Sequence, residues 1–193
     1  MGNTVLYMSM SLDGFIAGPN EADDNGLGDG GDRLHEWVFP PEGGVNSQIV
    51  EEFMSTGAVI AGRGTFEPAD GWKGDHHNGV PIWVLSRRPA PDWTTSLPAV
   101  HYTNDIEVAF REARDAAGER DVLVHGAATA QRAIAAGLLD EMEIHVIPVL
   151  LGEGRRLFEE LGRKHRELER LMVRAGEGGV THLRYRLIYP PAG

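Results

Sequence analysis

The chain has 193 residues and no cysteine, and its 29 acidic and 18 basic residues give a formal net charge of −11. These values exclude disulfides, thiolate metal sites and a cysteine nucleophile, and so acidic a surface disfavours nucleic acid and anionic membranes as partners. The length fits a single domain over residues 1–193. Neither a signal-peptide pattern nor an apolar run long enough for a membrane helix is found, so we expect a cytoplasmic protein.

The chain alternates between strand and helix patterns. Alternating, β-rich residues predict a first strand over 4–10, and a stretch rich in Gly, Asp and Pro predicts a long loop at about 18–47. Apolar residues at helical spacing predict a short amphipathic helix from Val45 to Met54. Further strands are expected at 58–61, 81–86, 99–102, 121–125 and 141–150, helices at 106–117 and 126–138, and a closing hairpin from 168–174 and 180–189. This order predicts an α/β fold whose central sheet is mostly parallel, with an antiparallel C-terminal hairpin.

Three predicted strands end in segments suited to bind phosphate. Residues 62–65 (Gly-Arg-Gly-Thr) follow one strand, and their glycines let backbone N–H groups approach an anion. Residues 86–88 (Ser-Arg-Arg) follow the next strand and suit a 2′-phosphate, the group that distinguishes NADP from NAD. Residues 125–129 (His-Gly-Ala-Ala-Thr) precede a helix whose N-terminus favours pyrophosphate. Because ligands bind at the carboxyl ends of strands in open α/β sheets, the three segments together predict a dinucleotide site.

Each segment also has a purely structural interpretation. The first could be an ordinary strand-to-helix turn, the second a solvated basic turn before Pro89, and the third a tight contact between helix and sheet. No single segment decides between the two interpretations, so the cofactor hypothesis depends on their joint occurrence.

Five segments carry a family resemblance by their sequence and order. They are MSLDGFIA at 10–17, GRGTFE at 62–67, VLSR at 84–87, VHGAAT at 124–129 and PVLLGEGRRLF at 148–158. Over about residues 4–188 the chain resembles the dihydrofolate reductase superfamily, and most closely the reductase domain of riboflavin biosynthesis (the RibD C-terminal domain) and its stand-alone relatives. The resemblance implies a dihydrofolate-reductase-like, three-layer α/β/α fold, a homodimer, and NADPH as cofactor.

The resemblance also implies residue roles. Residues 62–65 would hold cofactor phosphates, residues 126–129 would cover the pyrophosphate, and Ser86 and Arg87 would face the 2′-phosphate. Two residues after the first turn would line the nicotinamide. The full set of implied cofactor contacts is Ile16, Ala17, Gly62, Arg63, Gly64, Thr65, Ser86, Arg87, Gly126, Ala127, Ala128 and Thr129.

Three further residues are candidates for the reacting end of the site. Dihydrofolate reductases carry a substrate-binding carboxylate on the first helix, whereas this chain places Asn46 there, which argues against folate as substrate. Trp37 would stack on a planar substrate ring or, alternatively, anchor the long loop to the core. Asp13 is the catalytic candidate, and its alternative is a turn-stabilising residue before Gly14.

The predicted activity is hydride transfer from NADPH to a C=N or C=O group of a small heterocyclic substrate. One candidate substrate is 5-amino-6-(5-phosphoribosylamino)uracil, as in riboflavin biosynthesis. Two alternatives stay open: a true dihydrofolate reductase, and a non-catalytic, dimeric module that binds NADPH without turnover. The sparse inventory of acids and bases keeps the last alternative open.

No metal site is predicted. The acidic segment at 21–32 nearly fits the spacing of a calcium-binding loop, but it begins with Glu, ends with the shorter Asp and has no flanking helices. We expect it to be a lid over the active site instead. The pair His76 and His77 has no identifiable third ligand nearby, so a solvated polar loop is expected there.

Overall fold

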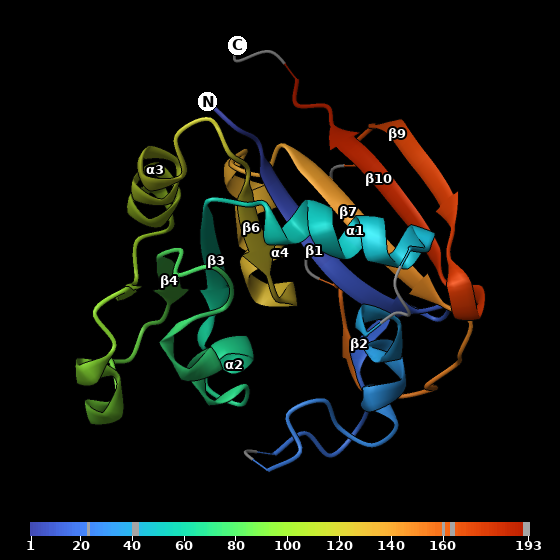
Figure 1. The fold of residues 1–193 in the computed structure, drawn as a ribbon, viewed down its shortest axis with the longest axis horizontal. Helices are drawn as coiled ribbons and strands as arrows, with labels where there is room; N and C mark the ends of the chain where they lie inside the picture. Colours follow the sequence, from blue (N-terminus) through green and yellow to red (C-terminus); the bar gives the residue numbers. More distant parts are fainter. Residues whose placement is uncertain (23, 40–42, 160, 163–164, 191–193) are drawn as a thin grey trace.

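A central β-sheet organises the fold in the computed structural model, which describes residues 1–22, 24–39, 43–159, 161–162 and 165–190. The strands of this sheet are β1 (Thr4–Ser11), β3 (Ala58–Gly62), β4 (Ile82–Leu85), β5 (Val100–Thr103), β6 (Val122–His125), β7 (Glu141–Ile147), β9 (Leu168–Ala175) and β10 (Thr181–Leu187). They lie in the order β5-β4-β3-β6-β1-β7-β10-β9 (Figure 1). The strands from β5 to β7 are parallel, whereas β10 is antiparallel to β7 and β9 is antiparallel to β10. The predicted α/β fold with its antiparallel C-terminal hairpin is confirmed.

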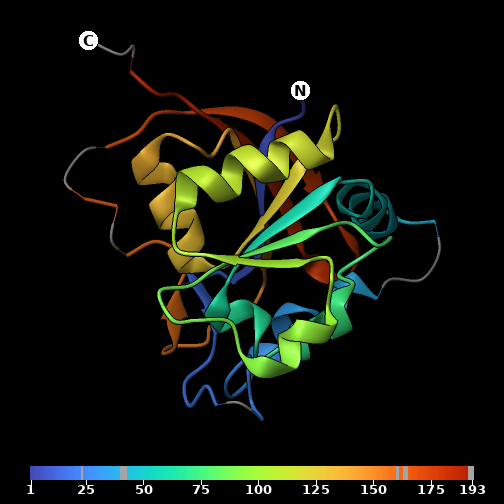
Figure 2. The ribbon, with the colours of Figure 1, turned by 90° about the vertical axis from the view of Figure 1, so that its left-hand side faces the viewer.

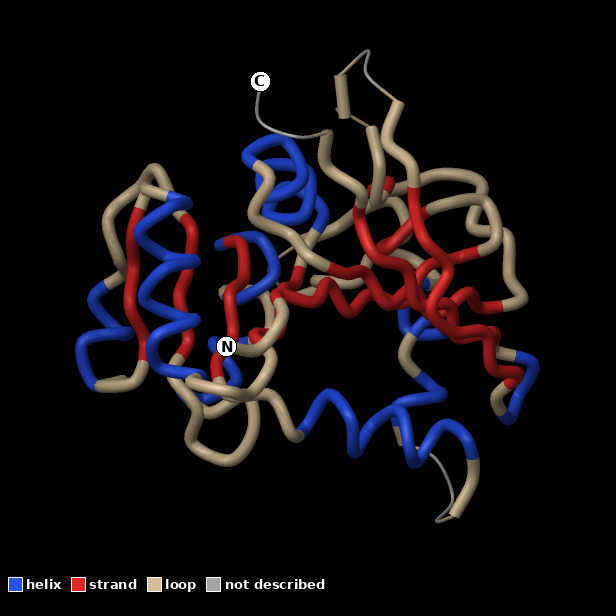
Figure 3. Tube along the Cα trace, turned by 90° about the horizontal axis from the view of Figure 1, so that it is seen from above, coloured by secondary structure: helices blue, strands red, loops and turns tan. Residues whose placement is uncertain are grey.

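Helices cover both faces of this sheet. The α-helices are α1 (Val45–Met54), α2 (Arg63–Phe66), α3 (Ile106–Ala117) and α4 (Ala127–Ala136), and the 3₁₀ helices are η1 (Gly31–Leu34), η2 (Glu36–Val38), η3 (Asp70–Gly74), η4 (Asp92–Ser96) and η5 (Glu177–Gly179). Figures 2 and 3 show α1 on one face of the sheet and α4 on the opposite face. The predicted helix at 106–117 begins where expected, because Asp105 accepts hydrogen bonds from the backbone N–H groups of Glu107 and Val108.

Strand alternation divides the apolar residues between two packed layers. Leu6, Ile60 and Val124 face α3 and α4, where they pack against Phe110 and Ile134. Each such side chain, once fully buried, stabilises the fold by about 1.5–3 kcal/mol relative to an exposed one. The three-layer α/β/α arrangement therefore follows from the period of two along each strand.

The opposite face of the sheet packs against α1 and α2. Val5, Val59 and Leu123 form a buried cluster there with Phe66, and Phe53 of α1 packs against it. Further along this face, polar and titratable side chains replace the apolar ones. The candidate site lies at this polar part of the face.

The predicted loop at 18–47 is more ordered than the sequence indicates. It contains η1 and η2, and α1 already begins at Val45. Leu34 and Trp37 are buried against Ile49 of α1, so two apolar residues fix the loop to the core. These two anchors could not be predicted, because isolated apolar residues in a Gly- and Asp-rich stretch form no periodic run.

A second, two-stranded sheet was not predicted. Strand β2 (Phe15–Ala17) pairs antiparallel with β8 (Arg155–Arg156). The pairing requires Gly154, whose φ is 134° and whose position leaves no room for a Cβ atom next to the carbonyl oxygen of Ala17. Two family-like segments far apart in the sequence thereby lie side by side.

None of the helices in the described part of the chain combines the length and the apolar run that a membrane span requires.

Candidate active site

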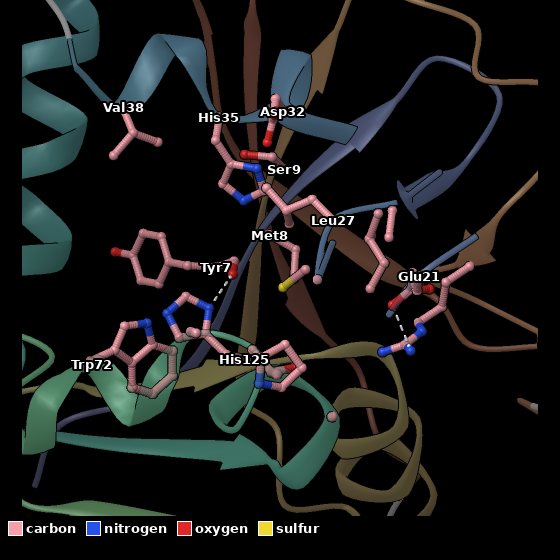
Figure 4. Close-up of a pocket in the computed structure, with 18 of the residues that line it drawn as sticks. Tyr7, Met8, Ser9, Glu21, Leu27, Asp32, His35, Val38, Trp72 and His125 are labelled. Atoms are coloured by element: carbon pink, nitrogen blue, oxygen red, sulfur yellow. Dashed lines mark hydrogen bonds and ion pairs between the residues drawn. The ribbon is translucent and has the colours of Figure 1, made fainter. Parts of the chain in front are cut away.

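A cavity of about 600 Å³ opens on the α1 face of the sheet, near the carboxyl ends of β3 and β6 (Figure 4). Its wall comes from β1, β2, the long loop, α1, the segment that runs from α2 through η3, and one residue each of β6, β7 and β8. The described residues that line it are Tyr7, Met8, Ser9, Ile16, Ala17, Glu21, Asp24, Asn25, Gly26, Leu27, Asp32, His35, Trp37, Val38, Phe53, Gly64, Thr65, Pro68, Ala69, Trp72, His76, His125, His145 and Arg155. Its volume falls within the usual range for small-molecule sites.

One end of the cavity is built from flat rings, and we call Tyr7, Phe53, Trp72, His76 and His125 the aromatic end. The ring centroids of Trp72 and His76 are 4.5 Å apart, those of His76 and His125 are 5.1 Å apart, and those of Tyr7 and Phe53 are 6.1 Å apart. Rings at these separations offer faces and edges on which another planar ring can pack.

Trp72 reaches the aromatic end from a strained backbone. Gly71, Trp72 and Lys73 all have positive φ, at 56°, 48° and 56°. For a residue with a Cβ atom this conformation costs about 1 kcal/mol or more. The strain is held by packing, since the Trp72 ring lies edge-on to Phe66 and to His76.

Two histidines of the aromatic end, His125 and His76, form a hydrogen-bonded chain with His77. The Nδ1 atom of His125 lies 3.0 Å from the carbonyl oxygen of Tyr7, its Nε2 atom lies 3.2 Å from Nε2 of His76, and Nδ1 of His76 lies 2.8 Å from Nδ1 of His77. A carbonyl oxygen only accepts, so His125 donates from Nδ1. In the neutral ring its Nε2 atom then accepts from His76, which in turn accepts from His77. The contacts to Tyr7 and along the chain are thus satisfied without any positive charge.

Burial keeps the cavity histidines neutral. Burial, together with a smaller effect of the neighbouring His125 ring, lowers the pKa of His76 to about 2, and burial lowers the pKa of His125 to about 4. Burial also lowers the pKa of His35 and of His145, which line the same cavity. At neutral pH these rings therefore add no positive charge to the cavity wall.

A second histidine chain holds Asn46 outside the cavity. The Oδ1 atom of Asn46 accepts a hydrogen bond from Nε2 of His182 at 2.9 Å, and Nδ1 of His182 lies 2.9 Å from Nδ1 of His145. Asn46 is buried and lines a separate cavity of about 230 Å³. The structure therefore does not bring this predicted substrate residue to the larger cavity.

Trp37 separates the two cavities and lines both. Its Nε1 atom donates to Oγ of Ser9 at 2.8 Å, and its ring centroid lies 4.3 Å from that of His145. The side chain is buried, so it anchors the long loop, and it also faces the larger cavity. Both sequence interpretations of Trp37 match its position.

Four of the predicted cofactor contacts line the larger cavity: Ile16, Ala17, Gly64 and Thr65. Gly62 and the segment at 126–129 lie directly behind them. A Cβ atom built on Gly126 would lie 2.5 Å from Oγ1 of Thr65, and one built on Gly62 would lie 3.0 Å from Oγ1 of Thr129. The two phosphate-type segments are therefore in contact, as their common position at strand ends predicts.

Arg63 joins the first predicted segment to the second. Its Nε atom is 2.8 Å from the Glu67 carboxylate, and its guanidinium also donates to Oγ of Ser86 at 3.3 Å and to the Pro89 carbonyl at 2.8 Å. Arg87 follows Ser86 and is exposed, without a hydrogen bond or ion pair to the residues that the structure describes. Ala127 is buried and Ala128 is exposed, both in the first turn of α4.

Asp13 lies outside the cavity wall. Its carboxylate accepts hydrogen bonds from Oγ of Ser11 at 2.6 Å and from the backbone N–H groups of Leu151 and Gly152 at 3.2 and 2.7 Å. The bond from Ser11 and those from the two amides lower its pKa. These contacts match the turn-stabilising alternative, since the carboxylate joins the turn after β1 to the segment before β8.

Most residues of the aromatic end could not be predicted from the sequence. Tyr7, Trp72 and His76 carry no motif, and only the fold brings them together. His125 had a usable signal, because it directly precedes Gly126 at the end of β6. Among the described residues, no group of three or more His, Asp or Glu side chains is arranged to hold a metal ion.

The cavity wall also carries charged side chains. Glu21, labelled in Figure 4, forms an ion pair with Arg155 at 2.7 Å, and Asp24 and Asp32 add two carboxylates to the lining. Described residues of the predicted lid, Glu21 and several between 24 and 32, thus supply part of the wall. Within this part of the chain, the Asn25 amide donates a hydrogen bond to the Asp29 carboxylate at 3.1 Å.

Similar folds occur in several solved structures. A protein from Shewanella sp. PV-4 whose name links it to riboflavin biosynthesis is 22% identical, with a TM-score of 0.71, and the match covers 97% of this chain and 99% of that one. RibD of Acinetobacter baumannii is 19% identical, with a TM-score of 0.66, covering 98% of this chain and 59% of that one. A Thermotoga maritima protein, a diaminohydroxyphosphoribosylaminopyrimidine deaminase/5-amino-6-(5-phosphoribosylamino)uracil reductase, is 12% identical, with a TM-score of 0.67, covering 97% and 57%. The chain thus spans less than two thirds of these last two proteins.

No match was found among curated protein sequences. The structural similarities lie below 25% identity and establish the fold. A family model described as the RibD C-terminal domain matches residues 4–181. Since this match covers nearly the whole chain and agrees with the fold, the protein belongs to the RibD C-terminal domain family.

Proposed function

We propose that this protein is an NADPH-dependent reductase that transfers a hydride to a C=N or C=O carbon of a small heterocycle. The observation that carries the proposal is the cavity itself. It joins four of the predicted cofactor contacts to an end lined by flat rings. Membership of a family of reductase domains supports the same activity.

The residues around the strand ends fit a dinucleotide phosphate. Gly62 and Gly126 have no side chain, and this lets the two segments pack closely: a Cβ atom would clash with Oγ1 of Thr65 at Gly126 and would be in tight contact with Oγ1 of Thr129 at Gly62. Arg63 lies beside Ser86, and Arg87 is exposed next to them. These side chains would bind the phosphates, including the 2′-phosphate that distinguishes NADPH from NADH.

The bound cofactor would supply the hydride, and the chain would supply position and environment. Ile16 and Ala17 are both buried and would present an apolar surface to the nicotinamide ring. The aromatic end would hold the second ring against it and exclude water. The neutral histidines there place no fixed charge beside the reacting carbon.

A cofactor titration tests the proposal. We expect the wild-type protein to bind NADPH more tightly than NADH, measured by fluorescence. Arg87→Ala should weaken NADPH binding by about 10- to 100-fold, because a charge-assisted hydrogen bond contributes about 1.5–3 kcal/mol. NADH binding should hardly change, since NADH lacks the 2′-phosphate.

Arg111→Ala is the matched control, because Arg111 is an exposed arginine on α3. It removes the same charge and should leave both affinities unchanged. Equal binding of NADPH and NADH by the wild type, or equal losses in the two variants, would contradict the cofactor assignment.

A further inference from the structure

Asn46, His182 and His145 form a hydrogen-bond chain that ends at the wall of the larger cavity. The side-chain nitrogen of Asn46 donates to the backbone carbonyl of Glu177 at 3.2 Å. Because a carbonyl oxygen only accepts, this bond sets the orientation of the amide, and Oδ1 of Asn46 lies 2.9 Å from Nε2 of His182. Gly176 leaves room for this contact, since a Cβ atom there would collide with Oδ1 of Asn46. The chain thus begins at an oxygen that can only accept.

This amide oxygen decides which nitrogens of the two histidines carry protons. Since the oxygen accepts, His182 donates from Nε2, and in the neutral ring its Nδ1 atom is an acceptor. Nδ1 of His182 lies 2.9 Å from Nδ1 of His145, so His145 donates from Nδ1. The other nitrogen of a neutral His145 ring, Nε2, then carries a lone pair instead of a proton.

Burial keeps both rings neutral, as this arrangement requires. His182 is 0% exposed and His145 is 2% exposed. Burial lowers the pKa of His182 to about 4, and burial together with the neighbouring His182 ring lowers the pKa of His145 well below its usual 6.5. At pH 7 the one proton of the His145 ring is therefore held on Nδ1.

Nε2 of His145 is open to the larger cavity. The ring lines this cavity, and its centroid lies 4.3 Å from that of Trp37 and 6.1 Å from that of Tyr7. No described residue forms a hydrogen bond with Nε2, and the atom is not among the unpartnered polar atoms that the protein encloses completely. Polar atoms in side chains as buried as this one normally have a partner. A ligand that donates a hydrogen bond would supply that partner.

The position of His145 in the sheet favours the substrate over the cofactor as the source of this donor. Two of the predicted phosphate segments follow β3 and β6, whereas His145 lies on β7, and β1 separates β7 from β6. The His145 ring is instead stacked near Tyr7 of the aromatic end, at an interplanar angle of 27°. A planar substrate ring bound at the aromatic end would thus lie next to His145.

We propose that Nε2 of His145 accepts a hydrogen bond from an N–H group of the heterocyclic substrate, and that Asn46, acting through His182, is the positioning residue that keeps this atom an acceptor. The inference rests on the proposed function and adds a specificity-determining residue to it. The uracil ring of 5-amino-6-(5-phosphoribosylamino)uracil carries an N–H group at both ring nitrogens, so it offers the donor that this atom requires. A methyl group in place of that hydrogen would leave the lone pair of Nε2 without a partner.

Nitrogen NMR of the full chain with isotope-labelled histidine tests the arrangement of protons. The His145 signals are assigned by their loss in His145→Asn. At pH 7 we expect a proton on Nδ1 of His145 and none on Nε2. Asn46→Leu removes the amide oxygen and should raise the fraction of His145 that is protonated on Nε2. Asn104→Leu is the control, because Asn104 is exposed and lies outside the chain, and it should leave the His145 signals unchanged.

Calorimetry tests the contact with the substrate. The probes are 5-amino-6-(5-phosphoribosylamino)uracil and its two analogues methylated at N1 or at N3, each titrated into the protein alone and into the protein saturated with NADP⁺. We expect one methylated analogue to bind at least about tenfold more weakly than the parent, the loss of about one hydrogen bond. His145→Asn keeps an amide to bind His182 but has no atom at the position of Nε2. This variant should bind the parent about tenfold more weakly and should no longer distinguish it from that analogue.

His101→Asn is the matched control, because His101 is exposed on β5. It should leave all three affinities unchanged.

The outcomes separate this inference from the proposed function. A proton on Nε2 of His145 in the wild type at pH 7 would overturn the inference. So would equal binding of all three probes by the wild type, a loss on methylation that persists in His145→Asn, or no binding of any probe. If NADP⁺ fails to bind, the proposed function fails on its own, and the NMR signals and the affinities measured without cofactor still decide the inference.

Discussion

Glu143 is fully buried on β7, and its Oε1 atom has no hydrogen-bond partner among the described residues. Its other oxygen lies 3.5 Å from the Arg184 guanidinium. Burial raises the pKa of Glu143 to about 7, an effect that Arg184 opposes and the Glu52 carboxylate reinforces. The folded protein therefore keeps a proton on this carboxyl that the unfolded chain releases at lower pH.

Glu143 should make the protein less stable as pH rises. The folded-state pKa is raised above the ordinary 4.5, so its stabilising effect is present at low pH and is lost between about pH 4.5 and pH 7. Glu143→Gln removes this titration. The free energy of unfolding of the variant minus that of the wild type should rise across this range by up to about 3 kcal/mol.

Denaturant unfolding at a series of pH values measures this difference. Glu119→Gln is the control, because Glu119 is an exposed carboxyl. A difference between Glu143→Gln and wild type that stays constant from pH 4.5 to pH 8, or that falls with pH, would contradict the assignment.

At the residue scale, the sequence predicted part of the site. Gly64 and Thr65 could be predicted because a short motif after a strand fixes where they lie. Asn46 and Asp13 were placed by analogy in a family pattern, and in this chain other residues bind them outside the cavity. Trp72 and His76 could not be predicted, because they reach the cavity from an irregular segment whose backbone conformation has no periodic signal.

At the scale of elements, the contact between two strand ends carries the predicted cofactor site. Gly126 has a φ of 92°, and a Cβ atom there would lie 2.5 Å from Oγ1 of Thr65. Gly118 has a φ of 66° as well, but a Cβ atom there would meet nothing within 4 Å. Both positions would place a residue with a Cβ atom at positive φ, but only Gly126 would add a steric clash. Comparing the two variants therefore isolates the effect of the clash.

Gly126→Ala should destabilise the protein more than Gly118→Ala. We expect about 1 kcal/mol for Gly118→Ala, from backbone strain alone, and about 2–4 kcal/mol for Gly126→Ala, where the clash with Thr65 is added. Denaturant unfolding measures both. Gly126→Ala should also weaken NADPH binding, whereas Gly118→Ala should not. Equal losses of stability in the two variants would contradict the close contact between these strand ends.

Most of the elements could be predicted, and the exceptions have physical reasons. Strand β1, strands β3 to β7 and the closing hairpin follow from runs of apolar and β-branched residues between turns. The strand predicted at 141–150 ends at Ile147, because Pro148 cannot donate a ladder hydrogen bond. Strand β8 has two residues, Arg155 and Arg156, and depends wholly on its partner β2, so no local pattern could reveal it.

At the scale of the whole molecule, the two faces of the sheet differ in the side chains that they carry. The face covered by α3 and α4 is packed with apolar side chains, whereas the α1 face carries the cavity and the histidine chains. A homodimer and a cytoplasmic location remain predictions from the sequence and the family resemblance. The proposed reductase would bind both its ligands on the α1 face.

The most direct test of this account is the oxidation of NADPH by the purified protein, followed through the absorbance of the reduced nicotinamide. We expect oxidation with 5-amino-6-(5-phosphoribosylamino)uracil or with the corresponding riboside, and none with dihydrofolate. Tight binding of NADPH without oxidation by the riboside or by its 5′-phosphate would contradict it and would instead indicate a non-catalytic binding module.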